Sequence, residues 1–227
     1  LVPCSTSTYG DQYIKLTNNT DHVLYADGIL FAISKYDSQA SSTGAYWAPS
    51  ELEDAIGVST VYQIPGKGKD VPVEAGKSIV IAVDAQDYTA DGGEGIDLSK
   101  ADYEFNDVND IYPDTDNPDV PNLQSWFISS WSYTTLHNRG MESYAIAFAP
   151  KGMTAETFMA DYAWVGKRVM DWNGYHFERD IQDAYLIPND GGVDGKAVNR
   201  KSENGKLVDT NNSTNDFNRN AVPTIAQ

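Results

Sequence analysis

The fold of this chain is decided by its opening stretch, Gln12-Tyr13-Ile14-Lys15-Leu16-Thr17-Asn18-Asn19-Thr20-Asp21-His22-Val23-Leu24-Tyr25-Ala26-Asp27-Gly28. Ile14 and Leu16 alternate with polar residues, as in a half-buried strand, and residues 17–22 have the composition of a turn. An extended run, Val23 to Tyr25, follows before Asp27-Gly28. The stretch therefore predicts a β-hairpin that opens a β-sandwich.

The rest of the chain continues this all-β pattern. Apolar or alternating runs predict the strands Ile29 to Ile33, Val58 to Ile64, Ile79 to Val83, Ser125 to Ser130 and Tyr144 to Phe148, and a later one at Asp183 to Pro188. We expect Ile79 to Val83 to be a central strand, and Tyr144 to Phe148 to be buried on both faces. Only Thr154 to Val165 resembles a helix, with Thr154 as its N-cap.

One long segment lacks this periodicity. Residues 84–122 are rich in Asp and Glu, and we interpret them as a loop-rich insertion held by the packing of Leu98, Tyr103, Phe105, Ile111 and Tyr112. No repeat or linker divides the chain. The sequence therefore predicts a single domain, 1–227, with an insertion at about 84–181.

Charge and composition restrict the partners and the cellular setting. Asp and Glu number 33 against 16 Lys and Arg, a net charge of -17 that disfavours nucleic acid as a partner. The sequence holds no apolar run of the roughly 18 residues that a membrane helix needs. Because the sequence begins with Leu1 rather than Met, we expect an exported chain whose targeting segment precedes it. Cys4, the only cysteine, follows a short apolar stretch as a lipid-modified cysteine would, although Pro3 departs from that signal.

Three blocks, in this order, resemble the lamin-tail domain pattern. They are the opening stretch with its Asn-Asn-Thr-Asp turn, the block Val73 to Ala82, and the ending Arg200-Lys201-Ser202 to Asp209-Thr210-Asn211-Asn212-Ser213-Thr214-Asn215-Asp216-Phe217. The whole chain looks most like the Bacteroidetes family known as domain of unknown function 4876. That resemblance implies an immunoglobulin-like (lamin-tail-like) β-sandwich, carried by an exported lipoprotein of the cell surface or outer membrane, or by a periplasmic protein. It implies no catalytic residues.

The acids of the insertion suggest a cation site, because Ca²⁺ prefers several carboxylate and carbonyl oxygens on a loop. Asp114, Asp116 and Asp119 are the candidate ligands, with the Gly-rich turn Asp190 to Gly195 as a second candidate. The first segment lacks the glycine and the final glutamate of an EF-hand loop, and solvated surface acids are the simpler interpretation. No other cofactor is predicted.

Aromatic residues in loops are candidates for ligand binding. Exposed rings stack on sugars or anchor a protein partner, and the chosen residues are Tyr46, Trp47, Trp172 and Tyr175. Core packing is the competing interpretation, and Trp126-Phe127 is assigned to the core.

The residues favour a non-enzymatic exported or cell-surface module that binds an unknown protein or glycan. Two alternatives stay open. One is a glycan-directed hydrolase that uses acids between Asp84 and Asp119, because the spacing of a catalytic carboxylate pair is not readable from sequence. The other is a structural adaptor domain that only spaces or docks other domains.

Overall fold

The computed structural model describes residues 10–37, 55–93, 95–105, 115–128, 134, 136, 142–149, 151–160, 168–171, 176–178, 196–210 and 213–225. Within them, most regular structure is β-strand, and the α-helices are the short α1 (Ala155–Ala160) and α2 (Ser213–Asp216). No helix of this part of the chain is long and apolar enough to cross a membrane. The fold is an all-β sandwich, as the sequence predicts.

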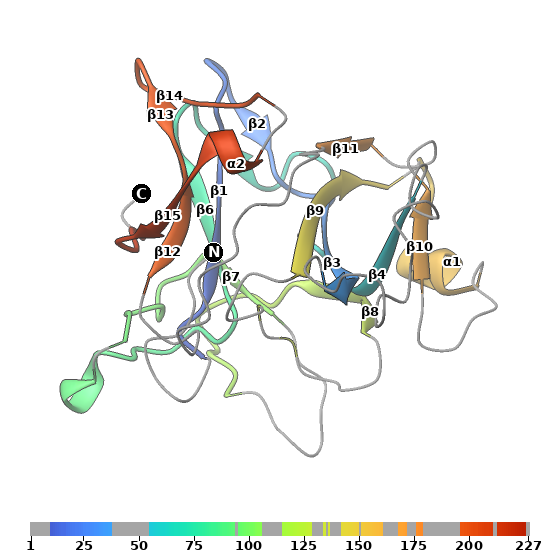
Figure 1. Cartoon of the computed structure of the whole chain (residues 1–227). Coiled ribbons are helices and arrows are strands. Elements are labelled where there is room, and N and C mark those ends of the chain that lie inside the picture. The colour runs from blue at the N-terminus through green and yellow to red at the C-terminus, as the bar shows by residue number, and fades with distance from the viewer. Residues whose placement is uncertain are drawn as a thin grey trace.

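Two sheets form the sandwich (Figure 1). The larger, six-stranded sheet has the order β10-β4-β3-β9-β11, with β8 also paired to β4. Its strands are β3 (Ile29–Asp37), β4 (Ala55–Gln63), β8 (Gln124–Ile128), β9 (Glu142–Phe148), β10 (Arg168–Asp171) and β11 (His176–Glu178). The smaller sheet has the order β1-β6-β7, made of β1 (Tyr13–Thr17), β6 (Ser78–Ala82) and β7 (Tyr103–Glu104). β6 is therefore central, as predicted.

The predicted opening hairpin is wrong, although both of its strands form. β1 pairs antiparallel with β6, and β2 (Leu24–Tyr25) pairs antiparallel with β5 (Pro72–Val73). Asn18 holds the corner between the two pairs, because its Nδ2 donates to the carbonyls of His22 at 2.7 Å and Val73 at 2.8 Å. Alternation identifies a strand but not its partner. Pairing with the buried β6 covers apolar surface that the short, exposed β2 does not offer.

The main core lies between the two sheets. Ile79 and Ile81 of β6 belong to one buried cluster with Phe31 of β3 and Tyr62 of β4. Phe105 enters this cluster from the acidic segment, and its ring stacks on Tyr62 with centroids 4.7 Å apart. Leu98 and Tyr103 are buried as well. Packing therefore holds the insertion, as predicted for these three residues, whereas Ile111 and Tyr112 lie outside the described residues.

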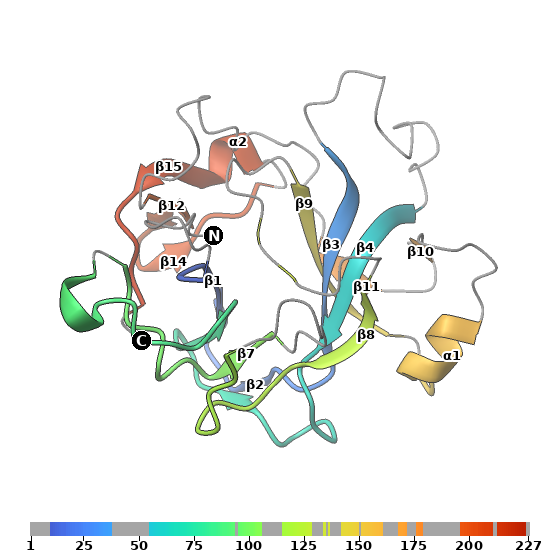
Figure 2. The same cartoon turned by 90° about the horizontal axis from the view of Figure 1, so that it is seen from below.

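Two further layers cover the outer faces of the sandwich, and Figure 2 shows them on opposite sides. Helix α1 covers the larger sheet, where Phe158 packs on Trp126 with ring centroids 5.8 Å apart. The ribbon of β12 (Ala197–Arg200) and β15 (Phe217–Ala221) covers the smaller sheet, where Ala197 joins Val80 and Ala82 in a buried cluster. Trp126 and Phe127 are thus core residues, as predicted.

The ending block that resembles the lamin-tail pattern has a structural role. Arg200 lies over the ring of Phe217, 4.3 Å from its centroid, and donates to the carbonyl of Val208 at 2.8 Å. Asp216 is fully buried, and its carboxylate accepts the N–H of Thr210 at 2.8 Å and lies 3.5 Å from Arg200. These contacts close the segment that also contains the hairpin of β13 (Ser202–Glu203) and β14 (Lys206–Leu207).

Other predicted elements differ in extent. β9 is not buried on both faces, because Phe148 is 43% exposed while Ala145 and Ala147 are buried. The three-stranded sheet is too narrow to cover every strand of the six-stranded one. Helix α1 is described over Ala155–Ala160, with the N–H of Thr157 directed at Thr154 Oγ1 at 3.3 Å, and the predicted residues 161–165 lie outside the described residues. The predicted strand at 183–188 lies outside them.

Candidate functional site

The acidic segment begins directly after β6, and Tyr88 anchors its first loop. The Tyr88 hydroxyl donates to Asp84 Oδ2 at 2.6 Å. A Cβ at Gly10 would lie 1.9 Å from that hydroxyl oxygen, and a Cβ at Gly93 would lie 2.2 Å from the Tyr88 carbonyl oxygen. The two glycines therefore leave the space that Tyr88 occupies, and the loop is held against the start of the described chain.

Glu104, at the end of β7, holds two separate parts of the acidic segment together through hydrogen bonds. It is fully buried, its Oε2 accepts the N–H of Ala85 at 2.9 Å, and its Oε1 accepts the N–H of Asn117 at 3.0 Å. Asn117 Nδ2 in turn donates to the carbonyl of Ala85 at 2.8 Å. One carboxylate thus connects the residues after β6 with the loop that leads to β8.

Further acids hold turns in the same way. The carboxylate of Asp87 accepts the N–H of Thr89 at 2.9 Å and its hydroxyl at 2.6 Å, and Asp97 does the same for Ser99 at 3.0 and 2.6 Å. Asp102 accepts a backbone N–H of β6 at 2.7 Å. These carboxylates act as hydrogen-bond acceptors within the fold.

Two of the acids have raised pKa values. Burial raises the pKa of Asp84, and its bond from Tyr88 opposes this in part. Burial likewise raises the pKa of Glu104, to which the nearby charges of Asp116 and Asp84 add, against the two backbone N–H bonds. Within the described residues, Asp84 Oδ1 is buried without a hydrogen-bond partner. Since a general acid must keep its proton near working pH, Asp84 is the better placed of the two for proton transfer. Glu104 is fully buried and both of its carboxylate oxygens accept backbone N–H bonds, so it does not face a substrate.

The predicted calcium ligands are only partly described. Asp116 and Asp119 are exposed, and Asp114 lies outside the described residues, as does the turn at 190–195. Asp116 accepts a bond from Asn122 Nδ2 at 2.8 Å. Among the described residues, no three His, Cys, Asp or Glu side chains are grouped as a metal site requires. The calcium site stays a prediction.

The predicted ligand-binding aromatics cannot be placed. Tyr46, Trp47, Trp172 and Tyr175 all lie outside the described residues. The large apolar side chains that are exposed in the described part are instead Leu24, Tyr25, Phe148 and Val222. Phe148 ends the strand that we expected to be buried on both faces, and Tyr25 ends the predicted extended run Val23 to Tyr25.

Sequence reasoning also missed a buried polar contact that closes the sandwich. The side chain of Gln12 pairs with the backbone of Leu136, donating to its carbonyl at 2.8 Å and accepting its N–H at 2.9 Å. Tyr62 Oη lies 2.7 Å from Thr134 Oγ1. Such long-range pairs leave no local sequence signal, because each partner has the composition of an ordinary loop or strand.

Asn18-Asn19-Thr20 matches the Asn-x-Ser/Thr triplet of N-glycosylation, but the side chain of Asn18 is used within the fold. Asn18 is 5% exposed, and both of its amide hydrogens are directed at backbone carbonyls. The folded chain therefore has no room for a glycan on Asn18. His22 is exposed, and its Nδ1 lies 3.0 Å from the carboxylate of Asp21, as expected for a surface histidine.

The comparisons with known proteins agree with this architecture. A crystal structure of a DUF4876 family protein from Bacteroides thetaiotaomicron is similar to the chain, with a TM-score of 0.67 and 20% identity over 95% of this chain and 67% of that one. At this identity the likeness shows the fold alone. The curated proteins include no match. The family model described as Protein of unknown function (DUF4876) matches residues 74–195, more than half of the chain. The chain therefore belongs to the DUF4876 family, as its resemblance predicts.

Proposed function

We propose that the chain is a non-enzymatic binding module of an exported or cell-surface protein, in which the sandwich presents loops to a protein or glycan. The observation that carries the proposal is the use of the acids in the insertion. Asp87, Asp97, Asp102 and Glu104 accept backbone N–H bonds, which hold loops in place. Preorganised loops reduce the entropy lost on binding.

The same hydrogen bonds argue against a catalytic role for these acids. A catalytic carboxylate must meet the substrate and exchange a proton with it. Glu104 is fully buried and both of its oxygens accept backbone N–H bonds, so its carboxyl group is not accessible to a substrate. These groups suit a scaffold better than an active site.

A thermal-shift screen with a panel of glycans, with Ca²⁺ and with EDTA tests the proposal. A binding module is expected to show a saturable rise in melting temperature with one ligand and no change in that ligand's covalent structure. Release of reducing ends from the same glycan would contradict a non-enzymatic role. An absence of any shift across glycans and candidate proteins would favour the structural adaptor.

One observation favours a second function, a glycan-directed hydrolase. Asp84 has a raised pKa, and its Oδ1 has no hydrogen-bond partner in the described part of the chain. If Asp84 is a general acid, Asp84→Asn should abolish hydrolysis of an unactivated glycan, whose leaving group must be protonated, while leaving the fold intact. Equal activity of the two proteins, or none in either, would exclude this role.

The location of the protein belongs to the same proposal. The family resemblance supports export, and Cys4 or a segment upstream would carry a lipid anchor. Fractionation of cells that express the full-length precursor, with metabolic labelling by a fatty acid, tests this. Recovery of unlabelled protein in the cytoplasm would contradict it.

A further inference from the structure

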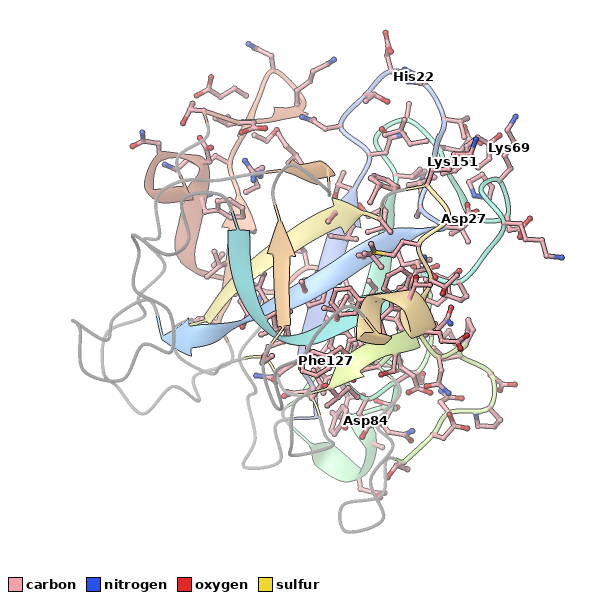
Figure 3. The ribbon with its side chains drawn as sticks, turned by 90° about the vertical axis from the view of Figure 1, so that its right-hand side faces the viewer. His22, Asp27, Lys69, Asp84, Phe127 and Lys151 are labelled. Carbon is pink, nitrogen blue, oxygen red and sulfur yellow. The ribbon has the colours of Figure 1, made fainter. Side chains whose placement is uncertain are left out.

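Several connections meet at the end of the larger sheet where β3 begins. Ile29, the first residue of β3, pairs with Phe148, the last residue of β9. The N–H of Gly28 donates to the carbonyl of Ile64, just after β4, at 2.9 Å. The loops 26–28 and 64–71 and the end of β9 at Phe148 therefore lie together, and Lys151 lies at the same end of the molecule (Figure 3). With the adjoining strand β2, we refer to this region as the lysine end.

The lysine end differs in charge from the rest of the protein. Lys67, Lys69 and Lys151 are exposed and make no ion pair with the described residues. The two acids of this region, Asp27 and Asp70, accept hydrogen bonds from backbone N–H groups. Asp27 is 5% exposed and accepts the N–H groups of Gly68 and Val71. Asp70 accepts the N–H of Lys67 at 2.9 Å. Among the described residues these three exposed ammonium groups have no ion-pair partner, on a chain whose overall net charge is -17.

Exposed apolar side chains lie at the same end. Leu24 is 41%, Tyr25 39% and Phe148 43% exposed. Lys69 Nζ lies 6.0 Å from the centroid of the Tyr25 ring. Aromatic rings interleaved with ammonium groups can hold a ligand that carries both apolar faces and negative charge.

Asp84, at the start of the acidic insertion, lies at a distance from this surface (Figure 3). Figure 3 shows Lys69 and Lys151 at one end of the molecule and Asp84 at the other. At physiological salt, exposed charges are screened over about 8 Å. A thin anionic ligand can therefore contact the lysines without approaching the acidic end, whereas a broad anionic surface meets the repulsion of the whole chain.

We propose that the lysine end binds an acidic polysaccharide, with Lys67, Lys69 and Lys151 contacting carboxylate or sulfate groups and with Tyr25 and Phe148 contacting sugar faces. This inference rests on the proposed binding function and names its ligand class. A single polysaccharide chain supplies both kinds of contact and is narrow enough to follow this end. An acidic protein or an anionic membrane is broad, and fits less well.

Binding of the full chain to polygalacturonate, followed by affinity electrophoresis at low and high salt, tests the inference. Neutral dextran is the uncharged control, and vesicles of phosphatidylglycerol and phosphatidylcholine provide the membrane arm. The test variant is Lys69→Gln with Lys151→Gln. The matched control is Lys100→Gln with Lys196→Gln, which removes the same charge from two exposed lysines outside the lysine end.

We expect salt-sensitive binding that weakens about tenfold or more in the test variant and stays within about twofold in the control. Both variants replace exposed side chains, and an unchanged melting temperature confirms that they fold. Equal losses in the two variants, no binding of the wild type to polygalacturonate, or preferential binding to the vesicles would overturn the inference. A neutral glycan or a protein ligand found instead would leave the proposed function standing, whereas turnover of a bound glycan would remove that function.

Discussion

Replacement of Glu104 by alanine tests whether the acids of the insertion are structural. The side chain is fully buried, and it accepts the N–H groups of Ala85 at 2.9 Å and Asn117 at 3.0 Å. Truncation leaves both donors buried without an acceptor, and it opens a space between the end of β6 and the loop before β8. We therefore expect Glu104→Ala to lower the free energy of unfolding.

The size of the effect follows from the bonds that are lost. Each buried N–H without an acceptor costs roughly 1–3 kcal/mol. Part of this is offset because alanine removes a carboxylate whose burial is itself unfavourable, as its raised pKa indicates. We expect a net loss of about 2–3 kcal/mol, which for a chain of this size lowers the melting temperature by roughly 5–10 °C.

Urea and thermal denaturation at neutral pH measure this loss. The matched control is Asp119→Ala, because Asp119 is an exposed acid of the same segment. It should change the free energy of unfolding by less than about 0.5 kcal/mol. If Glu104→Ala stays as close to the wild type as the control does, the acids do not organise the insertion and the reasoning fails.

Three further perturbations follow from the same structure. Asn18→Ala should lower the free energy of unfolding by about 2–3 kcal/mol, measured by urea denaturation, because it removes two hydrogen bonds from a buried amide to carbonyls at 2.7 and 2.8 Å. A loss below about 0.5 kcal/mol would contradict the role of Asn18 at the corner between the two strand pairs. Gly10→Ala should destabilise the protein strongly, since its Cβ would lie 1.9 Å from the Tyr88 hydroxyl oxygen. The loss in free energy of unfolding should be smaller when Tyr88 is already alanine. Additive losses in this double-mutant cycle would refute the contact. The pKa of Glu104 is raised in the folded state, so its contribution to stability is full below the ordinary value of 4.5 and is lost as pH rises through the folded pKa. As pH rises above 4.5, the stability difference between Glu104→Gln and the wild type should therefore shift in favour of the variant, and parallel curves of stability against pH would contradict this.

Local composition predicts most strands of this fold but not their pairing. Residues 79–83 form a short apolar run between turns, and they become the central β6. Ile14 and Leu16 alternate as a strand should, yet β1 selects β6 rather than the adjacent β2, because tertiary burial decides the partner. β12 and β15 escape prediction because residues such as Asn199 and Asn218 give no alternation, and the Arg200–Asp216 contact that holds them is not local.

The candidate site is less predictable than the fold. Sequence shows that residues 84–122 are acidic, but it does not separate Glu104, which is buried and bonded twice, from Asp119, which is exposed. That difference arises because β7 places the Glu104 carboxylate between the residues after β6 and the loop before β8, whereas Asp119 lies in that loop and faces solvent. Phe148 was expected in the core but is exposed. The sequence of a strand does not show how wide the opposing sheet is, and so does not show which of its residues that sheet covers.

The pairing of β1 with β6 has a consequence for how the chain folds. Tyr13 meets Ala82 and Thr17 meets Ser78, so the first strand gains its partner only after residue 82 has left the ribosome or the export channel. Until then Ile14 and Leu16 have no native neighbour to cover them, and the entropy of closing this loop is lost before any contact compensates for it. β1 is therefore synthesised well before the strand that covers it, and it is among the later parts of this sandwich to reach its native contacts.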